Sequence, residues 1–577
     1  MGNERNRIMP LSELQQNIVN ATGKVVVKAC PGSGKTYSVA ARIAHFIKNK
    51  DFHHNGIAAI SFTNTAWKEI NEKLTSDFNV NTPLPYPHFI GTIDSFLNQY
   101  IFLPFGHLVL GTNQRPNLVG EPHSHWSGKY YKDSFFDKIS INIEGDFYDK
   151  IGSRIPNRIK GGTNDVYSIK AQILKKGFCN QSDANYYSLQ ILRKYPQIAK
   201  NIVNRFPHFI IDEAQDTNDI QMEIINILVE NGLEEIMLIG DPNQAIFEWN
   251  NANPLLFEEK YQTWTPLTLN ENRRSSKKIC DCSNAFIGNE VSNPIEGEEI
   301  TNFDYTPIVR SIKNDDEVQN TIDEFLRDCE DRGIEISNEN VAILYRSKSF
   351  KRYFGEEQIE FDNQPWKSGA FHLRDIVQGK YLLEQGKFKN GFKLIEQGYF
   401  KGTMKISHVK REQIQKIINE IGFVPYRKML FDFIDSLPDT NKNLNDWLEQ
   451  AKLTLEEKRI EIDYTKTKAY VHISSLFDIQ EKDVLPYYHG TIHSAKGCTF
   501  EAVLILLSDR ASNSGTYRNL FKENYNQLNS NKQEELRIVY VALTRPRKVL
   551  NIGVPEVDLE LWKDKLSKKP VQLTLFG

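Results

Sequence analysis

A loop of small residues running from Ala29 to Thr36, ACPGSGKT, holds the clearest chemistry in the sequence. The apolar run Val25 to Val27 precedes it and the amphipathic stretch YSVAARIAHFI follows it, so the loop should join a strand to a helix. Glycines in that context let backbone N–H groups close around phosphates at the helix N-terminus. Lys35 would reach the β- and γ-phosphate oxygens, and Thr36 would ligate Mg²⁺. The residues expected to bind the nucleotide here are Gly32, Ser33, Gly34, Lys35 and Thr36.

A pair of carboxylates supplies the second half of such a site. Asp212 and Glu213 follow the apolar run in HFIIDEAQD. Asp212 can hold the Mg²⁺ shell through water, and Glu213 can orient and deprotonate an attacking water. The segment alone would also fit an acidic strand end that faces solvent. Beside a phosphate loop the catalytic interpretation is favoured, so the sequence predicts hydrolysis of ATP or GTP.

The bulk composition sets outer limits. At 577 residues the chain should hold about three to five domains, and 40% hydrophobic with 25% charged residues is typical of a soluble globular protein. Because the net charge is −3, a polyanion would have to bind in a local basic groove. Six cysteines in so long a chain are not a disulfide framework, and the close pair Cys280 and Cys282 lacks a second ligand pair, which favours packing over a metal site.

Membrane and export signals are not evident. No segment approaches the ~18 apolar residues of a membrane span, and the start MGNERNRIMP lacks the apolar run of a signal peptide. We therefore expect a cytoplasmic protein with no membrane partner.

The elements that must position these residues form two series of buried strands alternating with helices. The first series is KVVVKA, IAAISFTN, HFIIDEAQD and EIMLIGDPNQ, and the second is NVAILYRS, HGTIHSAKG, FEAVLILLSD and KVLNIGVP. This pattern predicts an α/β fold with parallel sheets, whose ligands bind at the carboxyl ends of the strands. Residues 97–204 and 347–484 differ in texture and are predicted to be insertions.

Taken together, the motifs resemble those of superfamily 1 helicases of the UvrD/Rep/PcrA family, from Leu11 to about Val554. They appear in the family's order: LSELQQNIV, ACPGSGKT with its initial alanine, SFTNTA, GTIDSF, DEAQD, IGDPNQAIFEWN, LNENRRS, TIHSAKGCTF and YVALTRPR. The resemblance implies two RecA-like parallel-sheet motor domains, 1A and 2A, with mainly helical insertions, 1B and 2B. The implied boundaries are 1–96 and 205–262 for 1A, 97–204 for 1B, 263–346 and 485–558 for 2A, 347–484 for 2B, and 559–577 for a C-terminal tail.

The resemblance also assigns roles around ATP. Gln15 would read the adenine edge, and Gln244 would sense the γ-phosphate. Arg274 and Arg545 would act as arginine fingers that neutralise charge on the transferring phosphoryl group. The expected catalytic set is therefore Lys35, Glu213, Gln244, Arg274 and Arg545, while Gln15 is expected to bind the nucleotide.

Two positions near the adenine depart from the family pattern. Tyr37 stands where the family usually has arginine, and Arg273 stands where it usually has tyrosine. We expect adenine to be sandwiched between one ring and one guanidinium with the two faces exchanged, since both groups stack on π surfaces. The alternative for Arg273 is an ordinary surface charge.

The DNA contacts implied by the resemblance are Phe62, Asn64, Thr92, Phe247, Trp249 and His493. Aromatic residues are more often core than stacking platform, but the polar neighbours of Trp249 favour stacking on a base. For His493, packing is nearly as well supported. Asp94 stands where the family often has histidine and Thr499 where it usually has glutamate, so we expect Asp94 to orient a neighbour instead of meeting a phosphate.

The predicted function is an ATP-dependent translocase or helicase on single-stranded or tailed duplex DNA, 3′→5′ by resemblance, acting in DNA repair or anti-phage defence. The alternative is a DNA-sensing regulatory ATPase that activates a partner nuclease without productive unwinding. Compact helicases of this kind occur in the Gabija anti-phage system beside an ATPase–nuclease of the overcoming-lysogenization-defect class. Residues Gln572 to Phe576 resemble a sliding-clamp peptide, although their alternation favours a final strand.

Overall fold

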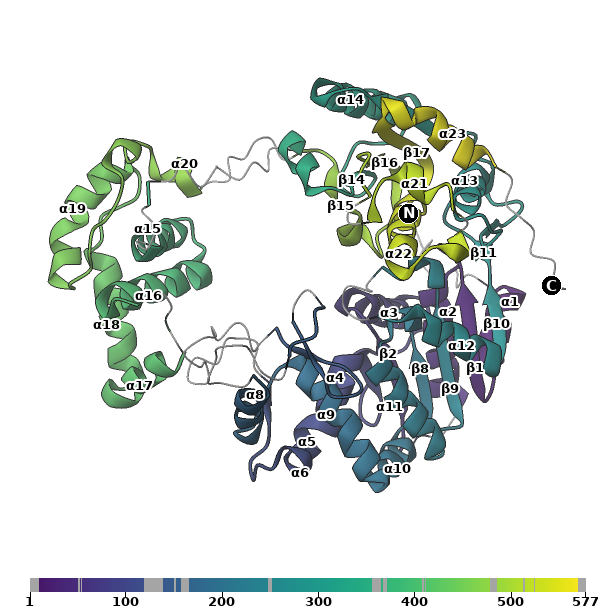
Figure 1. Cartoon of the computed structure of the whole chain (residues 1–577), viewed down its shortest axis with the longest axis horizontal. Coiled ribbons are helices and arrows are strands. Elements are labelled where there is room, and N and C mark those ends of the chain that lie inside the picture. Colours follow the sequence, from purple (N-terminus) through teal and green to yellow (C-terminus); the bar gives the residue numbers. More distant parts are fainter. Residues whose placement is uncertain are drawn as a thin grey trace, which may run out of the picture. The chain divides into compact units, whose positions relative to one another are not determined.

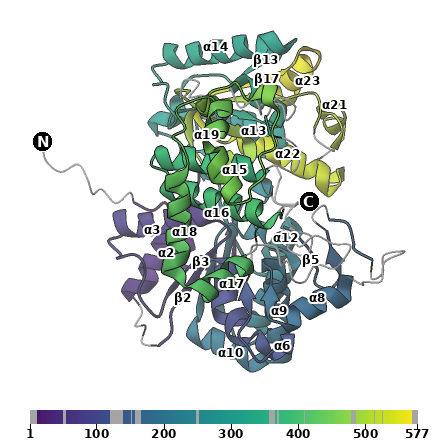
Figure 2. The same ribbon diagram turned by 90° about the vertical axis from the view of Figure 1, so that its left-hand side faces the viewer.

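The computed structural model describes residues 10–49, 52, 54–118, 138–149, 152–156, 166–246, 252–354, 365–366, 371–406, 409, 411–477, 485–511, 514–523 and 525–568. The chain divides into two compact units, residues 1–350 with 486–577 and residues 351–485 (Figures 1 and 2). Among the described residues, no helix combines the length and apolar character needed to cross a membrane.

The first sheet of the larger unit has six parallel strands in the order β10-β1-β9-β8-β2-β3. Its strands are β1 (Lys24–Ala29), β2 (Ile57–Ser61), β3 (Phe89–Thr92), β8 (His208–Ile211), β9 (Glu235–Gly240) and β10 (Thr265–Leu269). Every residue of β2 and β8 is buried, as expected for parallel strands covered on both faces.

Alternate residues of β1 show how the two faces are covered. Val25 and Val27 join a core with α1 (Glu13–Asn20), α2 (Lys35–Asn49) and α3 (Asn64–Ser76). Val26 faces the opposite core, which is built mainly from α4 (Ile93–Leu97), α9 (Gln181–Lys194), α10 (Pro196–Arg205), α11 (Asp219–Glu230) and α12 (Pro254–Thr263). The mixed order, in which β1 lies beside β9, brings the end of β1 next to the ends of β8 and β9.

One predicted boundary differs from the strand pairing. The second motor domain was expected to begin at residue 263, but β10 pairs in parallel with β1, from Val25 opposite Thr265 to Ala29 opposite Leu269. Edge strands that close a sheet from a distant part of the chain carry no local signal in the sequence. The first sheet therefore extends at least to Leu269.

The second sheet, also in the larger unit, has five parallel strands in the order β13-β17-β16-β14-β15. They are β13 (Ile308–Ile312), β14 (Val341–Tyr345), β15 (Tyr488–Thr491), β16 (Phe500–Leu506) and β17 (Pro546–Pro555). The helices α13 (Lys277–Ile287), α14 (Asp315–Asp331), α21 (Tyr517–Leu520), α22 (Ser530–Leu543) and α23 (Leu559–Ser567) pack around it. The α/β class with parallel sheets is thus confirmed.

Residues 97–204 are mainly helical where the structure describes them. Short helices α5 (Leu103–Phe105) and α6 (His107–Leu110) precede α8 (Val166–Lys175). Two small sheets join β4 (Asn117–Leu118) to β7 (Phe178–Cys179) and β5 (Ser140–Ile141) to β6 (Phe147–Tyr148). A buried ion pair, Lys170 Nζ to Asp183 Oδ2 at 2.7 Å, ties α8 to α9.

The smaller unit, described by itself, is helical. Its helices are α15 (Phe371–Glu384), α16 (Phe388–Met404), α17 (Arg411–Ile421), α18 (Phe423–Ser436), α19 (Leu444–Glu457) and α20 (Ile473–Phe477). Glycines let α15 and α16 approach closely, because a Cβ on Gly391 would lie 2.8 Å from the Gly379 carbonyl oxygen. The predicted insertion at 347–484 spans nearly the same residues as this unit.

Candidate active site

The phosphate loop lies where predicted, between the end of β1 and the start of α2. Gly32 and Gly34 have positive φ angles of 74° and 77°, which other residues rarely adopt. Space also requires glycine at the first position: a Cβ on Gly32 would lie 2.5 Å from the Cβ of Arg274. Ser33 Oγ donates to the Cys30 carbonyl oxygen at 2.8 Å and closes the turn. The loop is therefore built to meet the segment that carries Arg274.

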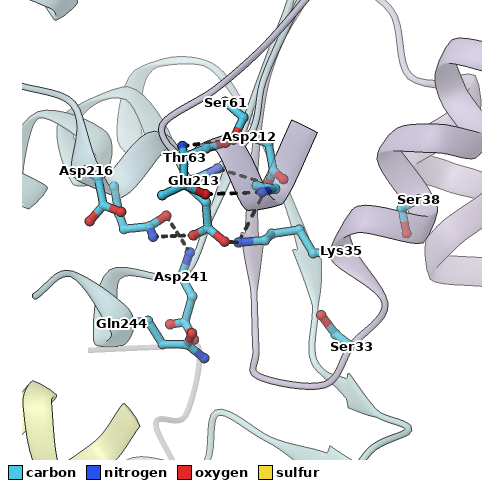
Figure 3. Close-up of polar contacts among 12 residues, drawn as sticks. Ser33, Lys35, Ser38, Ser61, Thr63, Asp212, Glu213, Asp216, Asp241 and Gln244 are labelled. Carbon is cyan, nitrogen blue, oxygen red and sulfur yellow. Dashed lines mark hydrogen bonds and ion pairs between the residues drawn. The ribbon is translucent and has the colours of Figure 1, made fainter. Parts of the chain in front are cut away.

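Lys35, the first residue of α2, lies on the predicted carboxylates (Figure 3). Its Nζ is 2.6 Å from Glu213 Oε1 and 3.6 Å from Asp212 Oδ1. Burial alone would lower the pKa of Lys35, but the charges of Glu213 and Asp212 raise it above its ordinary value. The lysine is thus charged. Its ammonium group pairs with the two carboxylates, and the phosphate oxygens of a bound nucleotide would compete with them for it.

Glu213 is held in a constrained position after β8. Its φ of 55° is left-handed, a conformation that costs energy for a non-glycine residue and is often found at functional sites. Gln215 Nε2 donates to Glu213 Oε2 at 2.5 Å, and Gln215 Oε1 accepts from the Asp241 N–H at 3.0 Å. Burial would raise the pKa of Glu213, but Lys35 and Lys496 hold it below its ordinary value. The carboxylate is therefore ionised and fixed, as a base must be.

Asp212 is placed so that its carboxylate could hold a hydrated cation through a bridging water. Its Oδ1 accepts from the Glu213 N–H at 2.9 Å, while its buried Oδ2 has no hydrogen-bond partner among the described residues. Burial raises the pKa of Asp212 against the opposing charge of Lys35. An unsatisfied buried carboxylate oxygen fits a hydrated divalent ion. Thr36, one residue beyond Lys35 on α2, is the nearby hydroxyl of the predicted metal pair.

Gln15 lies beside the phosphate loop. It belongs to the first turn of α1, where its Oε1 accepts from the Ser12 N–H at 3.1 Å in a capping box. A Cβ on Gly34 would lie 2.9 Å from its Nε2. Arg42 secures the other end of α1 by donating to the carbonyl oxygens of Ile18, Val19 and Ala21. The predicted adenine reader is thus held next to the nucleotide loop.

The second sheet contributes a buried arginine to the same place. Arg545 lies just after α22, is 1% exposed, and donates from Nη2 to Gln244 Oε1 at 3.2 Å. Burial lowers the pKa of Arg545 to about 9; the neighbouring Arg274 charge acts in the same direction, and the Glu213 charge opposes it. The structure therefore brings together Arg545, Arg274, Gln244 and Glu213, all of which were predicted as catalytic.

Arg274 is placed by a residue that sequence reasoning missed. Asn272 Oδ1 accepts from the backbone N–H groups of Arg274 and Ser275 at 2.8 and 2.9 Å, and Asn272 Nδ2 donates to Ser292 Oγ at 2.8 Å. The Arg274 side chain donates to the Thr544 carbonyl oxygen at 3.2 Å. Asn272 is part of the motif LNENRRS, but the motif alone did not indicate that its side chain holds the backbone of Arg274. Only the geometry of the turn shows this.

A second missed interaction joins the two sheets. Lys496 Nζ, in the turn after β15, lies 2.8 Å from Asp216 Oδ2, and the two side chains are 10% and 2% exposed. Burial raises the pKa of Asp216 to about 6, against the attraction of Lys496. Both residues stand in the quoted motifs DEAQD and HSAKG, but their pairing depends on how the sheets meet.

The residues of the proposed exchange at the adenine are near one another. The Tyr37 ring packs on Phe78 with centroids 5.1 Å apart, and the Arg273 charge lowers the Tyr37 pKa against the larger effect of burial. Arg273 also pairs with Glu298 at 3.4 Å and Glu271 at 3.6 Å. The Arg273 N–H donates to the Gly32 carbonyl oxygen at 2.9 Å, so the backbone of Arg273 lies against the phosphate loop. The stacking itself stays a prediction.

The predicted DNA contacts are only partly described. Phe62 is half-buried against the first core, and Thr92 caps α4 by accepting from the Ser95 N–H at 3.2 Å. His493 lies in the turn before Lys496, and burial, aided by Arg346, lowers its pKa. The side chain of Asn64 and all of Phe247 and Trp249 lie outside the described residues, as does the segment Gln572 to Phe576.

Two minor predictions can be located. Asp94 Oδ1 accepts from Asn185 Nδ2 at 3.2 Å, so this carboxylate does contact a neighbour. Cys280 and Cys282 are buried in α13, and no cluster of potential metal ligands is found in the described part of the chain.

Comparison with family models places the chain among known proteins. The UvrD/REP helicase N-terminal domain matches residues 11–115 and 160–265, which hold the phosphate loop, Glu213 and Gln244. The UvrD-like helicase C-terminal domain matches residues 489–556, which hold Lys496 and Arg545.

Curated relatives match most of the chain. A probable DNA helicase II homolog of Mycoplasma capricolum is 22% identical over 92% of this chain and 82% of its own. Gabija protein GajB of Bacillus cereus is 26% identical over 86% of this chain and 89% of its own. ATP-dependent DNA helicase PcrA of Staphylococcus epidermidis is 22% identical, with shares of 94% and 82%. The chain therefore carries the N- and C-terminal domains of UvrD-like helicases, with their motifs gathered in one site.

Proposed function

We propose that the chain is an ATP-driven DNA helicase that moves along single-stranded DNA. The observation that carries the proposal is that one lysine and two carboxylates, at the carboxyl ends of strands of the first sheet, meet Arg545, which directly precedes β17 of the second sheet. A site completed from two sheets can change when the sheets move, which is what a motor requires.

The hydrolytic step uses residues already in place. Glu213 accepts a proton from a water that attacks the γ-phosphorus, while the bond to the β-phosphate oxygen breaks and ADP leaves with that electron pair. Lys35, Arg274 and Arg545 balance the charge that spreads over the phosphoryl oxygens. Gln244, which now accepts from Arg545, would exchange that hydrogen bond for one to the γ-phosphate.

Thr36 and Asp212 would hold Mg²⁺ in this site. A bound Mg²⁺ would supply positive charge that offsets the negative charge of the phosphate oxygens. The unsatisfied Oδ2 of Asp212 supports this assignment.

Motion along DNA would be coupled through the interactions between sheets. Lys496 and His493 share one turn after β15, and Lys496 pairs with Asp216 three residues after Glu213. DNA bound at His493, Phe62 and Thr92 would therefore affect the position of the catalytic base, Glu213, through this ion pair. We also assign residues 97–204 and the smaller unit to the 1B and 2B subdomains, with 2A starting after β10.

Tailed duplexes test this function and its direction. The full chain should hydrolyse ATP faster with single-stranded DNA and should unwind a duplex with a 3′ tail but not one with a 5′ tail. Lys35→Ala should abolish both. A chain whose ATPase does not respond to single-stranded DNA would refute the motor.

The likeness to a Gabija protein supports a second candidate, a regulatory ATPase in anti-phage defence. The motif resemblance implies a nuclease partner for such a subunit. Full ATPase stimulation without unwinding, and a gain in unwinding or DNA cleavage on adding a co-purified nuclease, would favour this candidate over the solo helicase.

A further inference from the structure

The smaller unit carries an exposed aromatic face on α16 and α18, which lie side by side (Figures 1 and 2). Phe388, Phe423 and Phe431 are 71%, 60% and 50% exposed, and Val424 is 75% exposed. Large apolar side chains gathered on one face in this way usually mark an interaction site. We refer to Phe388, Phe392, Phe423, Arg427 and Phe431 as the aromatic face.

The rings are organised around one guanidinium. Arg427 Cζ lies 3.9 Å from the ring centroid of Phe392 and 5.8 Å from those of Phe423 and Phe431. Phe392 and Phe431 also pack on each other, with ring centroids 5.4 Å apart. Residues 423, 427 and 431 repeat every four positions, so they form one stripe on α18. Four members of the face therefore pack together, and Phe388 lies one turn before Phe392 on α16.

Lysines stand next to these aromatic residues in the sequence of α16 and α18. Lys387, Lys389, Lys393 and Lys428 are exposed, and none of them makes an ion pair within the part of the chain that the structure describes. Some other lysines of the same unit are paired: Lys380 with Glu384, Lys401 with Asp375, Lys405 with Glu461 and Lys442 with Asp439. Three carboxylates on the same two helices, Glu396, Asp432 and Asp435, add opposing charges, and Glu396 accepts from the Tyr426 hydroxyl.

We propose that the aromatic face binds single-stranded DNA, with bases stacked on Phe388, Phe423 and Phe431 and phosphates held by the surrounding lysines. Exposed rings interleaved with cations are the usual platform for unpaired strands. Lys387 and Lys389 also flank the N-terminus of α16, where free N–H groups favour anions. A protein partner would gain from the apolar area but would leave the unpaired lysines unexplained.

Two full-length variants test the stacking and the charge separately. Phe388→Ala, Phe423→Ala and Phe431→Ala together remove the rings, and Lys387→Gln, Lys389→Gln and Lys393→Gln remove the cations. The matched controls are Leu453→Ala, an apolar residue that is 74% exposed on α19, and Lys405→Gln, which removes an ion-paired lysine. All the altered side chains are exposed, so the fold should persist.

Affinity is measured with labelled oligothymidines of increasing length. Wild-type affinity should rise further once the oligothymidine is longer than the segment that the two motor domains bind. The ring variant should lose this additional affinity, by about fivefold or more for each stacked base removed. The lysine variant should lower the salt slope by about 0.7 for each phosphate that it no longer binds. Blunt duplexes should bind equally to the wild type and the ring variant, because paired bases cannot stack on the rings.

Cross-linking identifies the bound residues directly. Oligonucleotides carrying 5-iodouracil should cross-link to peptides containing Phe388, Phe423 or Phe431, and unlabelled single strands should compete. ATPase stimulation by an oligonucleotide short enough for the motor alone should stay unchanged in the ring variant, which separates this proposal from the motor function. Unchanged length dependence without such cross-links would overturn it, and so would a change only in self-association or in protein binding.

Discussion

The two sheets of the larger unit share an architecture and differ in chemistry. Both are parallel and packed against helices. The first sheet meets the nucleotide site with the carboxyl ends of its strands, whereas Arg545 of the second sheet lies at the amino end of β17. The first supplies the phosphate loop, Glu213 and Asp212, while the second supplies Arg545 and Lys496. The first sheet thus carries the carboxylates and the phosphate loop, and the second adds positively charged side chains to the same site.

This difference shows that the fold sets where a site lies and the loops set what it does. β1 ends in a glycine turn that leads into α2, whereas no described strand end of the second sheet has such a loop. On the proposed function, the second sheet would act on a nucleotide bound by the first. Its cations have most effect when they reach the γ-phosphate, and the following variants probe that division.

The largest effect is expected from the second sheet. Arg545→Lys keeps a cation but loses the planar donors, so kcat for ATP should fall by about 10³ or more with little change in KM. Single-turnover hydrolysis is the measurement. Arg310→Lys, at an arginine of the same sheet that pairs with Glu324 and Asp328, is the control. Equal losses in both variants would mean that Arg545 is structural.

The first sheet should respond nearly as strongly. Glu213→Gln removes the base but keeps the size of the side chain, so kcat should fall by about 10²–10⁴. ATP should bind at least as tightly, because Lys35 loses its 2.6 Å partner. Fluorescent ATP-analogue binding and steady-state kinetics together measure this. A loss of binding with kcat preserved would contradict the assignment.

The ion pair between the sheets should have an intermediate effect. Lys496→Gln and Asp216→Asn should each reduce DNA-stimulated kcat by about 2–30-fold and leave basal hydrolysis nearly unchanged. A double-mutant cycle should be non-additive, since the two atoms are 2.8 Å apart. Additive effects would show that the pair does not couple the sheets.

A smaller effect concerns the adenine. Arg273→Ala should raise the KM for ATP by about 2–5-fold if its guanidinium stacks on the base. Tyr37→Phe should leave KM unchanged and Tyr37→Ala should raise it. The exchange is refuted if Arg273→Ala leaves KM unaltered.

The smallest effect is on stability. Burial raises the pKa of Asp241 to about 7, and Lys35 only partly offsets this. Because the folded state then binds this proton more tightly than the unfolded state, stability should fall as pH rises from about 4 to 7. Asp241→Asn should therefore gain thermal stability over the wild type as pH rises through that window. A gain that does not change with pH would contradict the shifted pKa.

Much of the site was predictable because its signals are local. The glycine loop, the strand-end carboxylates and the arginines of RRS and TRPR each stand in a short motif. The loop and the carboxylates meet because the parallel strands of the first sheet end at one edge. Interactions that depend on how distant segments meet were not predictable: Asn272 under Arg274, Lys496 on Asp216, and β10 closing the first sheet. The aromatic face on α16 and α18 was missed for the same reason.

The most direct test of the account is a crystal structure of the chain with ADP, aluminium fluoride and Mg²⁺ on single-stranded DNA. We predict that Lys35 from the first sheet and Arg545 from the second both lie within hydrogen-bond distance of the fluoride. Arg545 still bound to Gln244, with no group of the second sheet at the fluoride, would contradict a site completed by two sheets.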